Sequence, residues 1–266
     1  MDFRGFEVSA NVSMLFTELP YLDRFAASAR CGFHLVESWW PFPEPTASPA
    51  EIDLLVTALK SAGVTLSALN FSGGDIPGGE RGIASHPDRQ EELAANISQM
   101  VEIAERTGCR LFNLLYGQLD DRWSPAEQQA CAVEAIRSAA SAVAGFGGTV
   151  LIEPLTSGLN GRYPLLTATD VLGLLDGPLK DVPNLSLLFD TFHLGSNGVD
   201  LVSTASAVGA DLAHVQLADS PGRGEPGSGS IDFAAVLDAL KLSGYHGVVA
   251  AEYKPTVDTA SSLTWL

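Results

Sequence analysis

Five apolar runs of this sequence end in a polar side chain that is able to do chemistry. The runs are FHLVE, TVLIE, LSLLFD, AHVQ and VVAAE, and they end at Glu37, Glu153, Asp190, Gln216 and Glu252. Oxygen atoms of these residue types are ligands that hard divalent cations prefer. Glutamate and aspartate also act as general acids and bases. Because the ends of buried strands meet at one edge of a sheet, we expect these side chains to converge.

Four of these residues predict a metal site. Carboxylates that converge raise one another's pKa, and a bound divalent cation removes the cost of ionising them together. Glu153, Asp190, Gln216 and Glu252 would supply four oxygen ligands and leave octahedral positions open for water or for two substrate oxygens. The set favours Mg²⁺ or Mn²⁺, because Zn²⁺ usually takes more His or Cys ligands. A single acid at a strand end is more often a helix cap or an ion-pair partner, but four successive polar ends favour the metal.

Two residues beyond the strand ends are candidates for substrate contact. His193 follows Asp190 by three residues and is expected in the loop past the strand, where it would reach a substrate oxygen or bond to a backbone carbonyl. Arg223 lies in the Gly/Pro-rich segment QLADSPGRGEPGSGSIDF and is one of the few cations close to the acidic residues. Its guanidinium would bind a negatively charged or hydroxylated substrate, unless it is a solvated loop charge.

The elements that must position these residues follow the pattern of βα units. Short apolar runs rich in Val, Leu and Phe alternate with longer Ala/Leu/Glu-rich segments of helical period. The predicted strands are Phe6 to Asn11, Phe33 to Glu37, Thr65 to Asn70, Arg110 to Leu115, Thr149 to Glu153, Leu185 to Asp190, Ala213 to Gln216 and Gly247 to Glu252. Eight parallel strands close a barrel, and active sites are built at the carboxyl ends of barrel strands.

Helical segments separate the predicted strands. They are Pro20 to Arg30, Ser48 to Ala62, Ser85 to Thr107, Ser124 to Gly145, Thr167 to Leu175, Leu201 to Val208 and Asp232 to Leu240. Two of them open with Ser-Pro-Ala-Glu, in which serine caps the helix and proline fits its first turn. No linker or low-complexity tract divides the chain, so we expect one α/β domain over residues 1–266, a (β/α)8 TIM barrel. The Gly/Pro-rich stretches Ser72 to Gly82 and Ser220 to Gly229 are expected to be functional loops.

Composition restricts the partners of this chain. There are 32 acidic and 15 basic residues, and the formal net charge of -17 repels nucleic acid and anionic membranes. A small anionic substrate would therefore need a local cluster of Arg, Lys or metal. Cys31, Cys109 and Cys131 show no CxxC spacing and are expected to be reduced, buried thiols. No apolar stretch reaches the ~18 residues of a membrane span, so we expect a soluble cytoplasmic protein.

The ordered set of motifs resembles the hydroxypyruvate isomerase family, within the xylose isomerase-like TIM barrel superfamily that also includes ketose 3-epimerases and endonuclease IV. The motifs are GGERGIASHPDRQEE (Gly78 to Glu92), IEPL, FDTFH, QLADSPGRGEPGSGSIDF and AEYKP. The resemblance covers nearly the whole chain. It implies that Glu153, Asp190, Gln216 and Glu252 hold a divalent metal ion and that Glu153 and Glu252 form the acid/base pair.

The resemblance also implies roles for residues that surround the metal ligands. His193 and Arg223 match positions that contact the substrate, and Glu37 is expected to help shape the pocket. Arg81, in the distinctive Gly-Glu-Arg-Gly motif, and Trp40, in ESWWPFPEP, are also assigned to the substrate-binding set.

Three positions bear on which substrate is used. Related epimerases have a histidine at the position of Gln216, which favours the hydroxypyruvate isomerase branch. Gly195 stands where a glutamine is usual in the family, and Trp39 and Trp40 replace smaller or single-aromatic patterns. Both departures are expected to face the pocket, so the reaction class is better specified than the substrate. The two tryptophans would pack against the carbon face of a sugar or form a plain hydrophobic lid.

The expected reaction is an aldose-ketose isomerisation by proton transfer through an enediolate, from hydroxypyruvate to tartronate semialdehyde. Glu153 or Glu252 would remove the proton from carbon, the other glutamate or a metal-bound water would return it, and Arg223 would pair with the substrate carboxylate. No redox cofactor is required, and the partner is a small hydroxy-keto acid or sugar. A homo-oligomer is compatible with the sequence.

Several alternatives remain open at this point. A 2-oxo-tetronate isomerase and a ketose 3-epimerase would use the same metal and the same two glutamates. An endonuclease would need more histidine ligands and a basic face for DNA, whereas this chain has five histidines and a net charge of -17. A binding protein without activity is disfavoured by the intact pair of Glu153 and Glu252.

Overall fold

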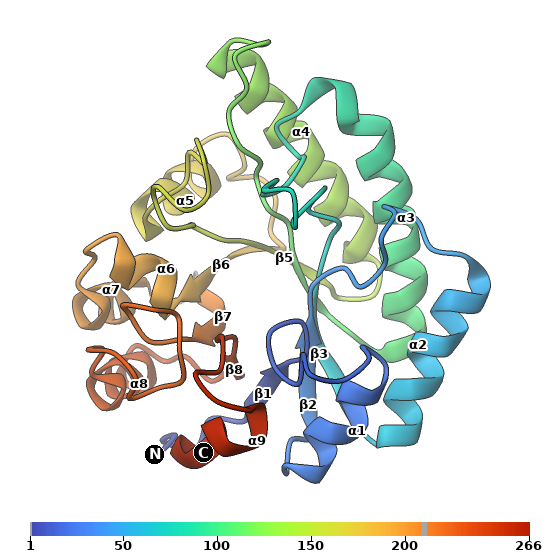
Figure 1. Cartoon of the computed structure of the whole chain (residues 1–266). Helices are drawn as coiled ribbons and strands as arrows, with labels where there is room; N and C mark the ends of the chain where they lie inside the picture. Colours follow the sequence, from blue (N-terminus) through green and yellow to red (C-terminus); the bar gives the residue numbers. More distant parts are fainter. Residues whose placement is uncertain (1, 209–211) are drawn as a thin grey trace.

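The eight strands form a closed parallel barrel in the computed structural model, which describes residues 2–208 and 212–266 (Figure 1). The strands are β1 (Val8–Asn11), β2 (Leu35–Ser38), β3 (Thr65–Asn70), β4 (Leu111–Asn113), β5 (Thr149–Ile152), β6 (Leu185–Asp190), β7 (Leu212–Leu217) and β8 (Val249–Ala251). Each strand pairs with its neighbours in the chain, and β8 pairs with β1. The predicted (β/α)8 TIM barrel and its eight strands are therefore confirmed.

Helices follow the strands around the barrel. They are α1 (Asp23–Arg30), α2 (Pro49–Ala62), α3 (Gln90–Thr107), α4 (Pro125–Ala144), α5 (Ala168–Leu175), α6 (Thr191–Ser196), α7 (Leu201–Val208), α8 (Phe233–Leu242) and α9 (Thr259–Ser262), with 3-10 turns at Pro87–Arg89 and Leu263–Trp265. The sequence did not predict α6 or α9. Helix α3 begins later than the predicted Ser85, because His86 precedes a proline and has the extended backbone that this position favours.

Local signals set the ends of the longer helices. Ser48 and Ser124 each form a capping box with the glutamate three residues later, which satisfies backbone N–H groups of the first turn. Helix α2 ends at Gly63 and α3 ends at Gly108, and both glycines have the left-handed backbone that a side chain disfavours. These short motifs allow the helix boundaries to be predicted from the sequence.

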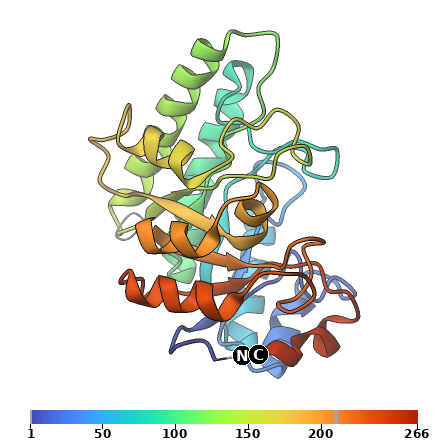
Figure 2. The ribbon, with the colours of Figure 1, turned by 90° about the vertical axis from the view of Figure 1, so that its left-hand side faces the viewer.

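The two halves of the barrel carry different sets of helices. In Figure 1, α1 to α4 lie on one side of the strands and α5 to α8 on the other. Figure 2 shows that long connections gather at one end of the barrel, on the right of that view. The two ends of the chain lie close together in both views. None of the described helices is long and apolar enough to cross a membrane.

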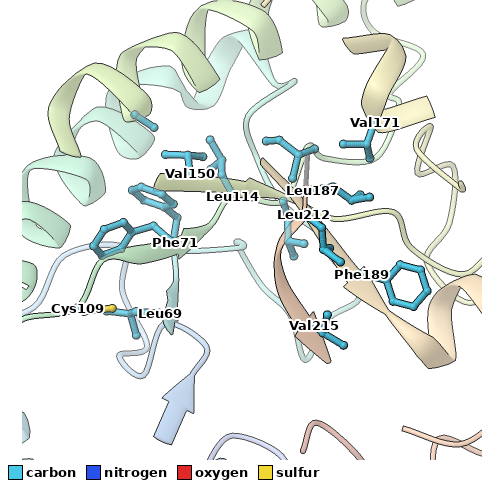
Figure 3. Close-up of a cluster of buried hydrophobic side chains, with 14 of the residues drawn as sticks. Leu69, Phe71, Cys109, Leu114, Val150, Val171, Leu187, Phe189, Leu212 and Val215 are labelled. Carbon is cyan, nitrogen blue, oxygen red and sulfur yellow. The ribbon is translucent and has the colours of Figure 1, made fainter. Parts of the chain in front are cut away.

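A hydrophobic layer fills the space between strands and helices. Figure 3 shows part of it, where Leu187 and Phe189 of β6 pair in register with Leu212 and Val215 of β7, and all four are buried. Burying each such side chain contributes about 1.5–3 kcal/mol, so this layer is the main support of the barrel.

The sequence predicted that the three cysteines are reduced and buried, and only the first part of this prediction holds for all three. Cys31, Cys109 and Cys131 are all free thiols, as expected. Only Cys109 is buried, and burial raises the pKa of its thiol to about 12. Cys31 and Cys131 are half-buried on helical segments, so the expectation that all three are buried is wrong.

Candidate active site

The polar residues at the strand ends converge at the mouth of the barrel. Glu153 follows β5, Asp190 ends β6, Gln216 lies in β7 and Glu252 follows β8. The parallel register sets Asp190 beside Gln216, so side chains of neighbouring strands emerge at the same level. All four side chains are at most 4% exposed. The structure therefore brings together the four residues that the sequence assigned to a metal.

Several oxygens of this cluster lack a partner within the described residues. Asp190 Oδ2, Gln216 Oε1 and Glu252 Oε2 are buried and accept no hydrogen bond. Glu153 Oε1 lies 3.7 Å from His193 Nε2, which is beyond hydrogen-bond distance. Buried acceptors and charges without partners are costly, and a cation that takes oxygen ligands would satisfy them together. The donor set therefore suits a cation that takes oxygen ligands.

His193 faces the same cluster, but its hydrogen bonds favour a role as a hydrogen-bond donor over a role as a metal ligand. Ligand atoms of Glu153, Asp190 and His193 lie within 4.8 Å of one another. The backbone N–H of Thr156 donates to His193 Nδ1 at 2.9 Å, so this nitrogen has no proton. The neutral ring then carries its proton on Nε2, which faces the carboxylates. An N–H group suits donation to a substrate oxygen better than metal ligation.

Burial keeps this histidine neutral. The side chain is 5% exposed, and burial, followed by the positive charges of Arg223 and Arg81, holds the pKa of His193 well below its usual value. A neutral imidazole adds no charge to the cluster. It offers one fixed donor toward the cavity instead.

The two carboxylate oxygens of Asp190 have different surroundings. Oδ1 accepts the backbone N–H groups of Phe192 at 2.7 Å and His193 at 3.0 Å, and thereby caps α6. Oδ2 faces the cluster. The expectation that His193 lies in a loop is wrong, because this cap starts a short helix directly after β6. The helix-cap interpretation of Asp190 is therefore confirmed for Oδ1, and Oδ2 is left without a hydrogen bond to the described residues.

The two glutamates have similar surroundings. Glu153 Oε2 accepts from Asn113 Nδ2 at 2.7 Å, and Glu252 Oε1 accepts from Trp39 Nε1 at 2.8 Å. Burial, with the nearby charge of Asp190, raises the pKa of Glu153 to about 8. Burial raises the pKa of Glu252 well above its usual value as well. Carboxyl groups with raised pKa values in a cavity are suited to exchange protons near neutral pH.

Glu37 lies behind Gln216 and does not line the cavity. Its Oε1 accepts from Asn11 Nδ2 at 2.9 Å and from Gln216 Nε2 at 2.8 Å. Its Oε2 lies 2.5 Å from His214 Nε2. Because a carboxylate can only accept here, the amide nitrogen of Gln216 faces Glu37 and the amide oxygen faces the site. The structure thus places Glu37 as a support of Gln216, at a distance from the pocket it was expected to shape.

A cavity of about 910 Å³ opens above the cluster. Glu153, His193, Arg223 and Glu252 line one part of it, and the loops after β2 and β3 line most of the rest. Those loops contribute Trp39, Trp40, Pro41, Phe42, Ser72, Gly73, Asp75, Ile76 and Arg81, among others. The expectation that the stretch Ser72 to Gly82 is a loop at the mouth is therefore confirmed.

The aromatic residues of the first loop differ in their contacts. Trp40 Nε1 donates to the carbonyl of Glu44 at 2.8 Å, and its ring packs edge-on against Phe42 with centroids 5.1 Å apart. Trp40 therefore forms part of an aromatic wall. Trp39 instead reaches the carboxylate of Glu252.

Arg223 is half-buried at the edge of the cluster and forms ion pairs with its acids. Its Nη2 lies 3.1 Å from Glu252 Oε1 and 3.6 Å from Asp190 Oδ2. The guanidinium carbon lies 5.4 Å from the centroid of the Phe192 ring, at the distance of a cation–π contact. The backbone of Arg223 has a positive φ of 60°, and its loop is fixed by Asp219, which accepts from Gly227 N. Arg223 therefore lines the mouth, but its charge is already shared.

One departure from the family pattern has a different location from the expected one. A Cβ at Gly195 would meet Ile231, Leu201 and Ser220 at 3.5–3.7 Å, and none of these residues lines the cavity. The expectation that Gly195 faces the pocket is wrong, because α6 turns this position toward α7. The glycine therefore gives no information on the substrate.

Three residues of this site were not singled out in the sequence. They are Asn11, Asn113 and His214. Trp39 was expected at the pocket, but not as a partner of Glu252. Asn11 ends β1 and Asn113 ends β4, so the rule of polar strand ends finds them once amides count beside acids. His214 precedes Gln216 by two residues in β7, which places both on one face of the strand.

Comparisons with known proteins agree with this fold. A putative hydroxypyruvate isomerase of Streptomyces coelicolor is 41% identical over 100% of this chain and 97% of its own length. The hydroxypyruvate isomerase of Escherichia coli is 33% identical, with 97% of each chain covered. The 2-oxo-tetronate isomerase of Haemophilus influenzae is 30% identical, with 97% and 96% covered.

A solved structure is also similar. The family 2 AP endonuclease of Brucella melitensis superimposes with a TM-score of 0.88 at 30% identity, with 98% of this chain and 97% of that chain covered. The family model described as the xylose isomerase-like TIM barrel matches residues 25–266. The chain therefore belongs to the xylose isomerase-like TIM barrel family.

Proposed function

We propose that this protein is a metal-dependent isomerase that moves a proton between neighbouring carbons of a small hydroxy-keto acid. Hydroxypyruvate is the favoured substrate, and tartronate semialdehyde is the product. The observation that carries the proposal is the pair of buried glutamates, Glu153 and Glu252, each with one anchored oxygen; the second oxygen of Glu252 has no hydrogen-bond partner among the described residues, and that of Glu153 lies 3.7 Å from His193 Nε2. Two such groups suffice for removing and returning one proton.

The metal ligands in this proposal are Glu153, Asp190, Gln216 and Glu252. When bound, a divalent ion such as Mg²⁺ or Mn²⁺ supplies a Lewis acid for the substrate's oxygens. The orphan oxygens of the cluster support this ligand set. Glu37 keeps the carboxamide oxygen of Gln216 turned toward the site.

The protein's own groups perform the proton transfer. One glutamate removes a proton from C3 of hydroxypyruvate, which gives an enediolate, and the other delivers a proton to C2. The proton of the C3 hydroxyl is transferred to the former ketone oxygen, so C3 becomes the aldehyde, C2 carries the new hydroxyl and no electrons leave the substrate. His193 donates its Nε2 proton as a hydrogen bond to a substrate oxygen, because Thr156 fixes the ring in this tautomer. Trp39 and Asn113 hold the two carboxylates in position.

The relatives support this reaction class and leave two candidate substrates, hydroxypyruvate and 2-oxo-tetronate. Two of the similar proteins are named for hydroxypyruvate and one for 2-oxo-tetronate. A cavity of about 910 Å³ has room for the four-carbon acid as well. We therefore retain 2-oxo-tetronate isomerase as the second candidate. The endonuclease named in the structural comparison is disfavoured, since a net charge of -17 repels DNA.

Proton exchange in heavy water tests the proposed function. The purified protein would be incubated in D₂O with Mn²⁺ and with hydroxypyruvate, C4 oxo-acids or common ketoses in parallel. We expect deuterium at the carbon next to the carbonyl of the acids and interconversion of isomers, both lost after treatment with a chelator. Exchange restricted to ketoses would support an epimerase instead. Absence of exchange with every compound would refute the proposal.

A further inference from the structure

Three arginines line the cavity, and they differ in their charge partners. Arg89 binds Glu80 at 2.8 Å and Glu92 at 2.5 Å. Arg223 binds Glu252 and Asp190. Arg81 has no carboxylate partner within residues 2–208 and 212–266. A cation that is enclosed by a cavity wall and has no counter-charge is a binding site for an anion.

Neutral groups hold Arg81 in place without cancelling its charge. Its Nε donates to Asn160 Oδ1 at 2.8 Å, and its Nη1 donates to the carbonyls of Ile76 at 3.0 Å and Glu80 at 2.6 Å. Nη2 makes no hydrogen bond to the described residues. Asn160 is 5% exposed, lines the cavity and donates to the carbonyl of Thr156 at 3.0 Å. The guanidinium is thus fixed through Nε and Nη1, and Nη2 is the nitrogen left to donate to a ligand.

A chain of hydrogen bonds connects this arginine to the reacting end of the cavity. Asn160 joins Arg81 to Thr156, and Thr156 in turn holds His193. Arg81 and His193 also both line the cavity, so the two side chains border one space. An anion on Arg81 would therefore lie in the same cavity as the substrate oxygen that His193 binds.

The two cavity arginines with access to the substrate are not equivalent. A substrate carboxylate on Arg223 would compete with Glu252 and Asp190, which already accept that charge, and it would be repelled by both. A carboxylate on Arg81 meets an uncompensated cation. We infer that Arg81, with Asn160 as its support, binds the carboxylate of the substrate, and that Arg223 is a positioning residue for Glu252.

This inference rests on the proposed function and specifies its substrate class. It assigns to Arg81 the contact that the sequence assigned to Arg223. The substrate is then a carboxylate-bearing keto compound rather than a neutral ketose. A phosphate ester offers a similar anionic end, and the test includes it as a separate probe.

Binding of unreactive probes gives the direct test. Glycerate, glycerol 3-phosphate and glycerol share a carbon chain and have no carbonyl to isomerise. Their affinity would be measured with the full-length, Mn²⁺-loaded protein by calorimetry and by the fluorescence of the cavity tryptophans. We expect wild type to prefer glycerate, and Arg81→Gln to bind glycerate about 10- to 100-fold more weakly, since a hydrogen bond to a charged group contributes about 1.5–3 kcal/mol. Glycerol binding should not change.

Two further variants control this measurement. Arg162→Gln makes the same change of net charge at an exposed arginine that does not line the cavity, and it should leave all affinities unchanged. Arg81→Lys retains the charge and should recover part of the glycerate affinity. If Arg81→Gln binds glycerate as wild type does, or if glycerol binding falls equally, the inference is wrong. Preference for glycerol 3-phosphate over glycerate would also overturn the assignment to a carboxylate.

Kinetics separate this inference from the proposed function. Arg81→Gln should raise KM for hydroxypyruvate with a smaller effect on kcat, whereas Arg223→Gln should lower kcat. A selective KM effect of Arg223→Gln, with none for Arg81→Gln, would return the carboxylate to Arg223. If wild type isomerises no compound but binds glycerate through Arg81, the proposed function fails while the binding site stands.

Discussion

Trp39 and Glu252 follow strands β2 and β8, and the indole Nε1 of Trp39 donates a hydrogen bond of 2.8 Å to Glu252 Oε1. The same oxygen accepts from Arg223 Nη2 at 3.1 Å. Glu252 Oε2 has no partner among the described residues and is the oxygen left for a ligand. Asn113 anchors Glu153 in a similar way. The barrel therefore presents two carboxylates, and in each of them one oxygen is fixed by a hydrogen bond while the other is left for a ligand.

The indole of Trp39 should matter for catalysis through this single hydrogen bond. Trp39→Phe keeps an aromatic ring and removes the donor, so Glu252 loses part of its orientation. We expect kcat to fall about 10-fold, the effect of losing one hydrogen bond to a charged group. Steady-state kinetics would measure this, with Trp123→Phe as the control, because Trp123 stacks on Arg122 away from the cavity. Equal kcat values for both variants would contradict the role of Trp39.

Replacement of either of the two glutamates proposed as acid and base tests the proton transfer itself. Glu153→Gln and Glu252→Gln preserve size and can still accept from Asn113 or Trp39, so the fold should persist. Neither amide takes up a proton at neutral pH, and we expect turnover to fall by about 10²- to 10⁴-fold. Circular dichroism would confirm folding, and product formation would be followed with Mn²⁺ present. Near-native activity of either variant would mean that the assigned acid/base roles are wrong.

The sequence predicted the parts of this molecule that depend on local patterns. Alternation of apolar runs and helical segments identified the eight strands, and polar strand ends identified Glu153, Asp190, Gln216 and Glu252. The support of Gln216 by Glu37 could not be predicted, because it arises where β2 and β7, far apart in the chain, face each other in the barrel interior. Gly195 was misplaced for a related reason. Its direction depends on the helix that Asp190 caps, and residue spacing does not give that direction.

Glu37 should affect metal affinity indirectly, through the orientation of Gln216, because it is not itself one of the proposed ligands. Glu37→Gln replaces one acceptor oxygen by an amide nitrogen, so it cannot accept from Asn11, His214 and Gln216 together. The carboxamide of Gln216 would then lose its fixed orientation. Loss of a group that orients a metal ligand typically costs 10- to 100-fold in affinity, and we expect about this loss for Mn²⁺.

Calorimetric titration with Mn²⁺ would measure the effect of Glu37→Gln. Glu7→Gln is the matched control, since it removes the same charge from an exposed position. It should bind Mn²⁺ as wild type does. An unchanged Mn²⁺ affinity in folded Glu37→Gln protein would show that Gln216 needs no such support.

The raised pKa of Glu153 links stability, pH and metal. The carboxyl has a pKa of about 8 when folded without metal, against a usual value of 4.5, because burial and the charge of Asp190 disfavour its ionised form. Between these two values the folded state holds a proton that the unfolded state has released. Stability from this group is thus complete below about pH 4.5 and is lost as the pH rises toward about 8. Glu252 shifts in the same direction.

A bound cation should reverse this trend, because it requires the ionised carboxylates and competes with their protons. We expect the melting temperature of chelator-treated protein to fall between about pH 5 and pH 8, and the stabilisation by Mn²⁺ to grow over the same range. Thermal unfolding at several pH values, with and without Mn²⁺, measures both trends. Glu153→Gln removes the titrating group and should flatten the metal-free slope. A Mn²⁺ effect that is equal at both ends of the range would mean that these carboxylates do not bind the ion.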